Sequence, residues 1–347
     1  MRVVRPIAVA VVGTVALAAG IFGLTTWKVQ DFMSSPVAVP ADGVSFSIPS
    51  GSSFAAVARD LVEMDIIEDD RWYRLYARWS GDANAIHAGD YIIESGSTPE
   101  SLLQKFTAGD VRLYSFTIIE GWNHRDLLRA LHAHDAVQAS MTDEDWPGLL
   151  ADLDAANSYP EGLFLPETYR FPQGSTDREI LAQAYDLMQR ALAEEWAARD
   201  DSTPVTTPYE ALVLASIVEK ETARPDERAR IAGVFTRRLE KRMRLQTDPT
   251  VIYGIGPQFN GNLTRKDLRT DTPYNTYTRS GLPPTPIAMP GRAAIRAALN
   301  PAVGEELYFV ATGHADGSHQ FSKTRAEHDV AVAEYLKRLR ARRLRGS

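Results

Sequence analysis

A stretch of 21 residues without a charged side chain, 7–27, is the most apolar part of the chain. As a helix rising about 1.5 Å per residue, it would cross the bilayer's hydrocarbon core, which is about 30 Å thick. Arg2 and Arg5 precede the stretch and Trp27 ends it, which places the short N-terminal side in the cytoplasm. The pattern predicts a cytoplasmic stub at 1–6, a transmembrane helix at 7–27 and export of the rest.

A cleaved signal peptide is the alternative for the same stretch. Ala16-Leu17-Ala18 resembles the small-residue site at which such peptides are cut. The apolar run nevertheless continues as far as Trp27, which is long for the core of a signal peptide. We therefore favour the uncleaved anchor, which brings the lipid bilayer into contact with residues 7–27.

The next segments alternate between strand-like and helix-like periodicity. A serine- and proline-containing stretch predicts a linker at 28–43, and a period-two pattern then begins at Val44. Helical spacing and a Thr98-Pro99 start signal complete a small α+β module at 44–112. Its predicted elements are a strand at 44–48, helices at 54–62 and 71–79, a strand at 89–94 and a helix from 99.

The remainder, 113–340, has no internal repeat and predicts one larger α+β domain. A basic tail follows at 341–347, and six basic residues lie between Lys337 and Arg345. That end is either a solvated helix end or a contact for anionic lipid or glycan. The elements predicted before the helix at 208–222 are a strand at 113–119, a helix near 127–131, a partly helical acidic stretch at 142–159, a loop-to-strand segment at 161–169 and a helix at 177–198.

Composition narrows the classes of function. Of 347 residues 44% are hydrophobic and 24% charged, which is ordinary for a globular protein and argues against disorder. The net charge is 38 − 45 = −7, unfavourable for a nucleic-acid partner. The chain has no cysteine, no His-Glu-x-x-His, no Gly-x-Ser-x-Gly and no glycine-rich phosphate loop. We therefore expect neither a metal nor any other cofactor.

The strongest candidate for chemistry is the end of one very apolar helix. Pro208 opens it, residues 211–218 carry no charge, and Glu219 and Glu221 stand at its C-terminal end. The helix dipole at that end favours cations, and apolar surroundings withhold solvation, so both effects raise the pKa of a carboxyl group. A raised pKa is what a general acid at neutral pH requires.

Periodicity does not choose between the two glutamates. Glu221 shares a helix face with Leu214, and Glu219 shares another face with Leu212 at the same spacing. Either carboxylate could instead form a structural ion pair, and the cations within reach in the sequence are Lys220, Arg224 and Arg228. From the residues alone, both interpretations stay open.

Three downstream segments combine aromatic side chains with amides and hydroxyls. These are residues 244–254, Tyr274-Asn275-Thr276-Tyr277 and Gly281-Leu282-Pro283-Pro284. Aromatic rings stack on the apolar faces of sugars, while amides and hydroxyls pair with sugar hydroxyls and N-acetyl groups. The composition suits a carbohydrate groove, although ordinary turns have similar composition.

Together with Ser216–Thr222, these segments closely resemble the YceG-like (MltG) family of endolytic murein transglycosylases, over nearly the whole chain. The resemblance implies an N-terminal membrane helix, a LysM-like module at 44–112 and a catalytic domain at 113–340. It assigns catalysis to Glu221, the second glutamate of Glu-Lys-Glu-Thr. Thr285 stands where the family often has glycine. The matching positions implied to bind substrate are Gln246, Asp248, Tyr253, Asn275 and Tyr277.

The resemblance also implies an activity, partners and a location. The enzyme would cleave the bond from N-acetylmuramic acid to N-acetylglucosamine without water, leave 1,6-anhydro ends and end strand elongation. Its partners would be peptidoglycan glycan strands and the synthases, on the outer side of the bacterial inner membrane. Two alternatives remain: a non-catalytic glycan-binding scaffold, and a hydrolytic muramidase in which Asp248 activates water. Whether the LysM-like module binds glycan or only packs also stays open.

Overall fold

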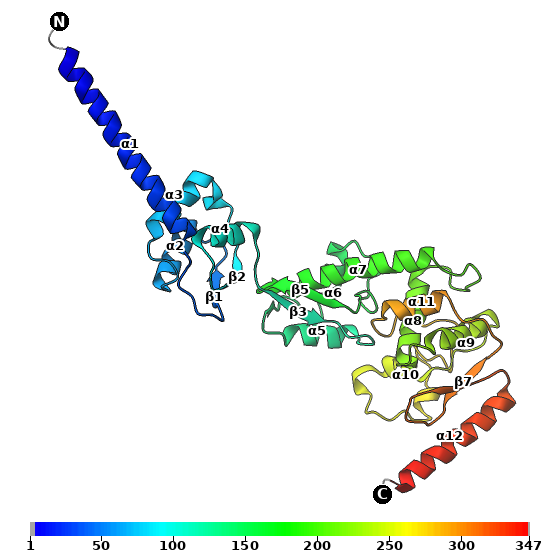
Figure 1. The fold of residues 1–347 in the computed structure, drawn as a ribbon. Coiled ribbons are helices and arrows are strands. Elements are labelled where there is room, and N and C mark those ends of the chain that lie inside the picture. The colour runs from blue at the N-terminus through cyan, green and yellow to red at the C-terminus, as the bar shows by residue number, and fades with distance from the viewer. Residues whose placement is uncertain (1–3, 346–347) are drawn as a thin grey trace. The chain divides into compact units, whose positions relative to one another are not determined.

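The computed structural model describes residues 4–345, with side chains described for 13–341, and divides into two compact units (Figure 1). Unit 1 comprises residues 1–114 with 171–173, and unit 2 comprises residues 115–170 with 174–347. The α+β class predicted from the sequence is confirmed, since helices and strands alternate through both units.

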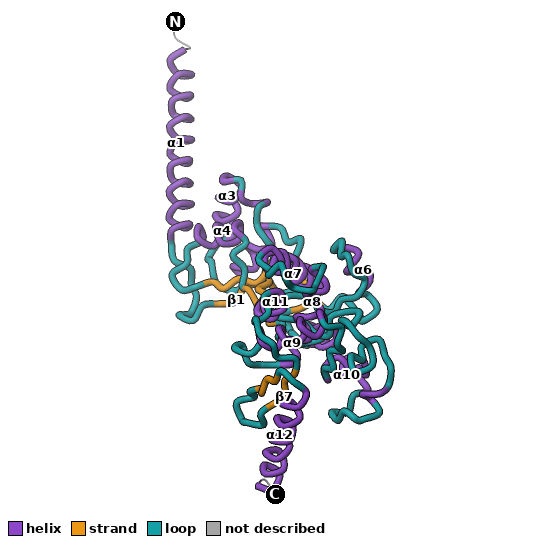
Figure 2. Tube along the Cα trace, turned by 90° about the vertical axis from the view of Figure 1, so that its right-hand side faces the viewer, coloured by secondary structure: helices purple, strands orange, loops and turns teal. Residues whose placement is uncertain are grey.

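Helix α1 (Val4–Ser34) is a single uninterrupted helix (Figure 2). It extends seven residues past Trp27, so the linker predicted at 28–43 is wrong over its first part. Val29 and Met33, four residues apart on one helix face, are buried in the core of unit 1 and explain the extension. Among the described residues, no helix is long and apolar enough to cross a membrane. Within the predicted stub and span, residues 1–3 and the side chains of 4–12 lie outside the description.

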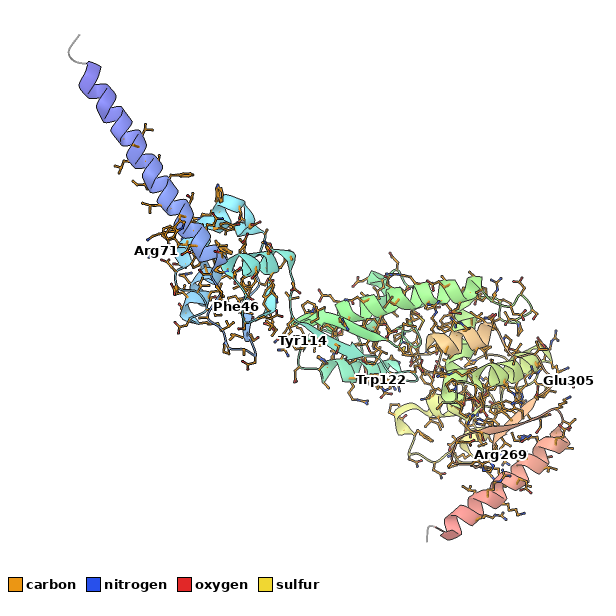
Figure 3. All side chains as sticks on the ribbon, in the orientation of Figure 1. Phe46, Arg71, Tyr114, Trp122, Arg269 and Glu305 are labelled. Carbon is orange, nitrogen blue, oxygen red and sulfur yellow. The ribbon has the colours of Figure 1, made fainter. Side chains whose placement is uncertain are left out.

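The rest of unit 1 has the predicted order of strand, helix, helix, strand and helix. Strand β1 (Val44–Ile48), which carries Phe46 (labelled in Figure 3), pairs antiparallel with β2 (Gly89–Ile93). In this register Phe46 lies opposite Tyr91. The ring of Phe106 packs against both, with centroids 5.8 Å from Phe46 and 4.8 Å from Tyr91. This aromatic group forms the centre of the core. The helices are α2 (Phe54–Glu63), α3 (Asp70–Ser80) and α4 (Pro99–Ala108), with a 3₁₀ turn at Asp82–Asn84.

Among the described residues, unit 2 holds eight helices and short paired strands, apart from strand residues 113–114 and 171–172, which belong to unit 1. The strand pairs are β3 (Leu113–Thr117) with β5 (Thr168–Pro172), β4 (Val137–Gln138) with β6 (Ser175–Thr176), and β7 (Tyr308–Ala311) with β8 (His319–Ser322). The helices are α5 (His124–His132), α6 (Trp146–Asp152), α7 (Asp177–Ala197), α8 (Pro208–Glu221), α9 (Arg228–Glu240), α10 (Asp248–Ile255), α11 (Arg292–Leu299) and α12 (Arg325–Arg345). Two 3₁₀ turns lie at Gly256–Gln258 and Asp267–Arg269.

The acidic stretch at 142–159 is helical only over α6, since its ends are turns and loop. The carboxylate of Asp145 explains the first turn, because it accepts hydrogen bonds from the amide (2.7 Å) and hydroxyl (2.8 Å) of Thr142. In the predicted tail, α12 continues through Arg345, while the side chains of 342–347 lie outside the description.

Helix α8 is the central helix of unit 2. All eight residues from Ala211 to Val218 are buried, as expected for a helix that is apolar on every side. Helix α11 packs closely against it with three buried alanines, Ala294, Ala297 and Ala298, and α7 and α9 contact the same pair. Because α8 is held on several sides, the position of its C-terminal residue, Glu221, is fixed.

Candidate active site

Glu221 is the last residue of α8, and Thr222 after it is extended. The Glu221 side chain is partly buried, and its Oε1 accepts a hydrogen bond from the hydroxyl of Thr247. It faces a cavity of about 370 Å³ that is lined by several segments of unit 2. The other lining residues are Arg238, Leu245, Gln246, Asp248, Tyr277, Tyr308, Phe309, Val310, Arg325, His328 and Val332.

Burial raises the pKa of Glu221 to about 7, and the negative charge of Asp248 acts in the same direction. The hydrogen bond from Thr247 opposes the rise, as do the charges of His319 and Arg238. At neutral pH a large share of the molecules therefore carries a protonated Glu221. The carboxyl can then both give up a proton and take one back.

Glu219 has different surroundings. Its carboxylate accepts hydrogen bonds from the guanidinium of Arg228 at 3.1 Å and from the amide of Gly291 at 3.0 Å. Burial raises its pKa as well. Within the described part of the chain, Glu221 forms no ion pair, so only Glu219 fits the structural alternative.

Lys220 and Arg224, the other cations that the sequence placed within reach of Glu221, also pair with different groups. The Lys220 amino group donates to the carbonyl of Gly121 at 3.0 Å. Arg224 pairs with Asp226 at 2.7 Å and with Asp316 at 3.4 Å. Glu221 is thus left facing the cavity with a hydroxyl as its hydrogen-bond partner.

Gln246, Asp248 and Tyr277 lie around the same cavity as Glu221. The Tyr277 hydroxyl donates to Asp248 Oδ1 at 2.6 Å, so this carboxylate, at the start of α10, is oriented by the loop that carries Tyr277. Gln246 has a φ of 51°, a left-handed conformation that is uncommon for residues other than glycine and that often occurs at functional sites. Three of the five predicted binding residues are therefore brought together with Glu221.

Asn275 and Tyr253 do not lie in this cavity. Asn275 is fully buried, its amide donates to the carbonyl of Thr270 at 2.7 Å, and its oxygen accepts from the amide of Tyr277 at 2.9 Å. A buried amide needs such partners, so Asn275 shapes the loop instead of contacting substrate. Tyr253 donates to Glu161 at 2.8 Å and lines a second cavity.

Sequence reasoning missed Thr247, Arg238 and His328. Thr247 lies between Gln246 and Asp248 in the candidate segment 244–254, so its position in the sequence could have indicated a place in the site. Arg238 is buried and donates to the carbonyls of Leu307 and Leu245, each at 2.7 Å, which holds β7 beside the segment that precedes α10. His328 on α12 stacks on Tyr308 with centroids 5.2 Å apart, and burial lowers its pKa. No sequence pattern indicated that α12 would close this side of the cavity.

Comparison with known proteins identifies the family of the chain. The model of the YceG-like family matches residues 46–334. An endolytic murein transglycosylase of Bacillus subtilis (strain 168) is 32% identical, and the match covers 84% of this chain and 85% of the relative. One of Streptococcus pneumoniae (strain D39) is 27% identical over 84% of this chain, but the match spans only 58% of that relative's length.

A solved structure of a YceG-like protein is also similar to this chain. The crystal structure of a YceG-like protein from Listeria monocytogenes matches 84% of this chain and 99% of its own, with a TM-score of 0.53 and 28% identity. The chain belongs to the YceG-like family, which confirms the resemblance found in its motifs.

Proposed function

We propose that the protein is a peptidoglycan transglycosylase, a lyase that acts on glycan strands and uses Glu221 as its single proton-transferring group. The observation that carries the proposal is the position of Glu221 at the end of the buried helix α8, facing a cavity that also holds Gln246, Asp248 and Tyr277, where burial raises its pKa to about 7. The endolytic murein transglycosylases among its relatives support the substrate class.

In the first step, protonated Glu221 gives its proton to the glycosidic oxygen between N-acetylmuramic acid and N-acetylglucosamine. The C–O bond at the anomeric carbon breaks, N-acetylglucosamine leaves with a free 4-hydroxyl, and the neighbouring N-acetyl oxygen relieves the positive charge. In the second step, the muramyl C6 hydroxyl attacks the anomeric carbon and passes its proton to Glu221. The products are a 1,6-anhydro end and a restored acid, so neither water nor a second carboxylate is consumed.

Hydrolysis is the second candidate, because Asp248 is exposed in the same cavity. A carboxylate there could activate a water molecule and give a reducing end. Tyr277 already donates to Asp248, and Asp248 raises the pKa of Glu221, which favours a positioning and electrostatic role. Digestion in ¹⁸O-labelled water separates the two candidates: the transglycosylase leaves unlabelled anhydro ends, and a muramidase leaves labelled reducing ends.

The test of the function itself is digestion of isolated sacculi followed by muropeptide analysis. Wild type is expected to produce new anhydro ends within strands, and Glu221→Gln is expected to produce none. Binding to strands without new ends from the wild type would favour the glycan-binding scaffold. Release of anhydro products by Glu221→Gln at the wild-type rate would remove Glu221 from the reaction.

We also propose that residues 7–27 anchor the protein in the inner membrane, with the catalytic domain outside and close to newly made strands. The uncharged run supports this, as do the exposed apolar side chains of α1, which include Phe22, Leu24 and Trp27. Such a position would let the enzyme limit strand elongation beside the synthases. Membrane fractionation tests the anchor: the full chain should resist extraction by carbonate, and a chain lacking 1–27 should be released.

A further inference from the structure

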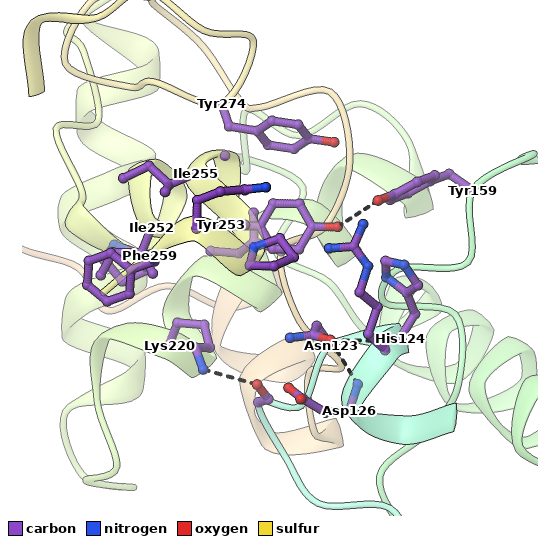
Figure 4. A pocket seen from close by; sticks show the side chains of 18 of the residues that line it. Asn123, His124, Asp126, Tyr159, Lys220, Ile252, Tyr253, Ile255, Phe259 and Tyr274 are labelled. Atoms are coloured by element: carbon purple, nitrogen blue, oxygen red, sulfur yellow. Dashed lines mark hydrogen bonds between the residues drawn. The ribbon is translucent and has the colours of Figure 1, made fainter. Parts of the chain in front are cut away.

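Unit 2 contains a second cavity, of about 840 Å³ (Figure 4). The N-terminal part of α5 and the C-terminal part of α10 form two of its sides. Tyr159, Tyr253 and Tyr274 contribute aromatic surface, and Lys220 lies at its lower edge in the figure. A cavity of this size accommodates a drug-sized molecule or a short peptide.

The two cavities are neighbours along the chain at two points. Lys220 lines the second cavity and Glu221 the first, while Asp248 lines the first and Pro249 the second. Consecutive Cα atoms are about 3.8 Å apart, so the two cavities adjoin the same two segments of the chain. A strand long enough to reach from Glu221 past these segments would place its substituents at the second cavity.

The charge of the second cavity is opposite to that of the whole chain. Arg125, Arg129 and Lys220 line it against the single carboxylate of Asp126, which gives 3 − 1 = +2, whereas the chain carries −7. Arg129 is neutralised by Asp126 at 3.1 Å, and Lys220 is held by a backbone carbonyl. Over the part of the chain that is described, Arg125 has no ion-pair partner, so its guanidinium is available to a ligand.

A buried carboxylate lies behind this cavity but does not supply the missing partner for Arg125. Glu161 is fully buried and accepts hydrogen bonds from Tyr253 at 2.8 Å and from His124 Nδ1 at 2.7 Å. The Tyr253 hydroxyl also lies 3.2 Å from that of Tyr159. These hydrogen bonds fix the positions of Tyr159 and Tyr253 at the side of the cavity. The guanidinium of Arg125 instead lies near Gly256, at the end of α10.

From these features we infer that the second cavity binds the peptide stem carried by N-acetylmuramic acid and that Arg125 pairs with a free carboxylate of that stem. Guanidinium groups pair with carboxylates through two parallel hydrogen bonds, and tyrosine rings pack on the apolar parts of a peptide. The inference rests on the proposed function, since the stem is a substituent of the same strand. It makes Arg125 a specificity-determining residue.

The test compares uncrosslinked strands that keep their stems with the same strands after an amidase has removed them. On stem-bearing strands, Arg125→Ala is expected to lower kcat/KM about tenfold, mainly through KM. On stripped strands, which keep the lactyl carboxylate, the loss should be less than twofold. Arg170→Ala, which removes an exposed arginine of β5 outside both cavities, is the matched control and should match wild type on both. An equal loss on both substrates, or no loss on stem-bearing strands, would overturn the inference.

A binding experiment keeps this inference separate from the proposed function. The soluble stem peptide is titrated into Glu221→Gln, and into the same protein with Arg125→Ala added. The second replacement should weaken Kd about tenfold, and a peptide with its carboxyl groups amidated should bind the first protein equally weakly. Unchanged affinity in either arm contradicts the inference even if cleavage proceeds. Absence of cleavage by wild type, in contrast, refutes the function and leaves this measurement intact.

Discussion

The hydroxyl of Thr247 donates a hydrogen bond to the carboxylate of Glu221, which connects the end of α8 to the residue that precedes α10. This bond favours the ionised form of Glu221, whereas burial favours the neutral form. The two effects act on different steps of the proposed reaction. Burial keeps the proton available for the first step, and Thr247 stabilises the carboxylate that the first step leaves behind.

Replacement of Thr247 by valine removes the hydroxyl with little change of volume. The pKa of Glu221 should rise, so the alkaline limb of the pH–rate profile should move to higher pH. The turnover number should fall by about 10- to 100-fold, because a hydrogen bond to a charged group contributes about 1.5–3 kcal/mol and each step of about 1.4 kcal/mol is a factor of ten in rate. Thr247→Ser keeps the hydroxyl and should stay close to wild type; a serine variant as slow as the valine variant would contradict the role of the hydrogen bond.

Glu221→Gln should change stability in a pH-dependent way. The folded-state pKa of about 7 lies above the ordinary value of 4.5, so the folded protein binds the proton more tightly than the unfolded chain. Below about pH 4.5 Glu221 is protonated in both states and does not lower the free energy of unfolding of the wild type. That free energy falls as the pH rises from 4.5 through 7 and stays at the lower value at higher pH. The glutamine variant should be more stable by about 1–3 kcal/mol at pH 8 and equal at pH 4. Urea unfolding at both pH values measures the difference, and equal stability at pH 8 would contradict the raised pKa.

Alanine at Glu219 and at Glu221 should have opposite effects. Glu219→Ala removes one acceptor from the partly buried guanidinium of Arg228, which keeps Glu120 as a partner, and another from the amide of Gly291, so stability should fall by about 1–3 kcal/mol. The folded protein should still cleave strands within about tenfold of the wild-type rate. Glu221→Ala should stay folded and lose cleavage. Thermal unfolding and muropeptide release, measured on both variants, decide this; loss of cleavage by a folded Glu219→Ala would show that the two roles are not separate.

Asp248→Asn removes a negative charge that raises the pKa of Glu221. The pKa of Glu221 should fall, and the alkaline limb of the pH–rate profile should move to lower pH. The products should keep their anhydro ends, because the proposed reaction uses no second carboxylate. Loss of all cleavage together with labelled reducing ends in the wild type would instead identify Asp248 as a base.

Local patterns predicted most of the elements, because their signals lie within a few residues. The alternation at 44–48 predicted a strand with the bounds that the structure has, and the cap at Thr98 predicted the start of a helix at Pro99. The extension of α1 to Ser34 was missed, since Val29 and Met33 are held there by residues of the module more than ten positions away. Such helix ends depend on tertiary packing and not on the local sequence.

The site was predictable only in part for a similar reason. The rise in the pKa of Glu221 follows from its place at the end of an apolar helix, which the sequence displays. The choice between Glu219 and Glu221 depended on family resemblance. Arg228, the ion-pair partner of Glu219, belongs to a separate helix, α9, so the pattern of α8 does not show the pairing. Asn275 and Tyr277 stand two residues apart, yet one is buried under a loop and the other lines the cavity. That difference arises from the loop conformation, which the spacing does not encode.

The proposed reaction requires that Glu221 carries a proton near neutral pH in the free protein. Carbon-13 NMR of glutamate-labelled protein, with Glu221→Gln to assign the signal, follows the titration of this carboxyl directly. A midpoint close to pH 7 is expected. A midpoint below pH 5 would contradict it, because the group would then be ionised when the glycosidic oxygen needs a proton.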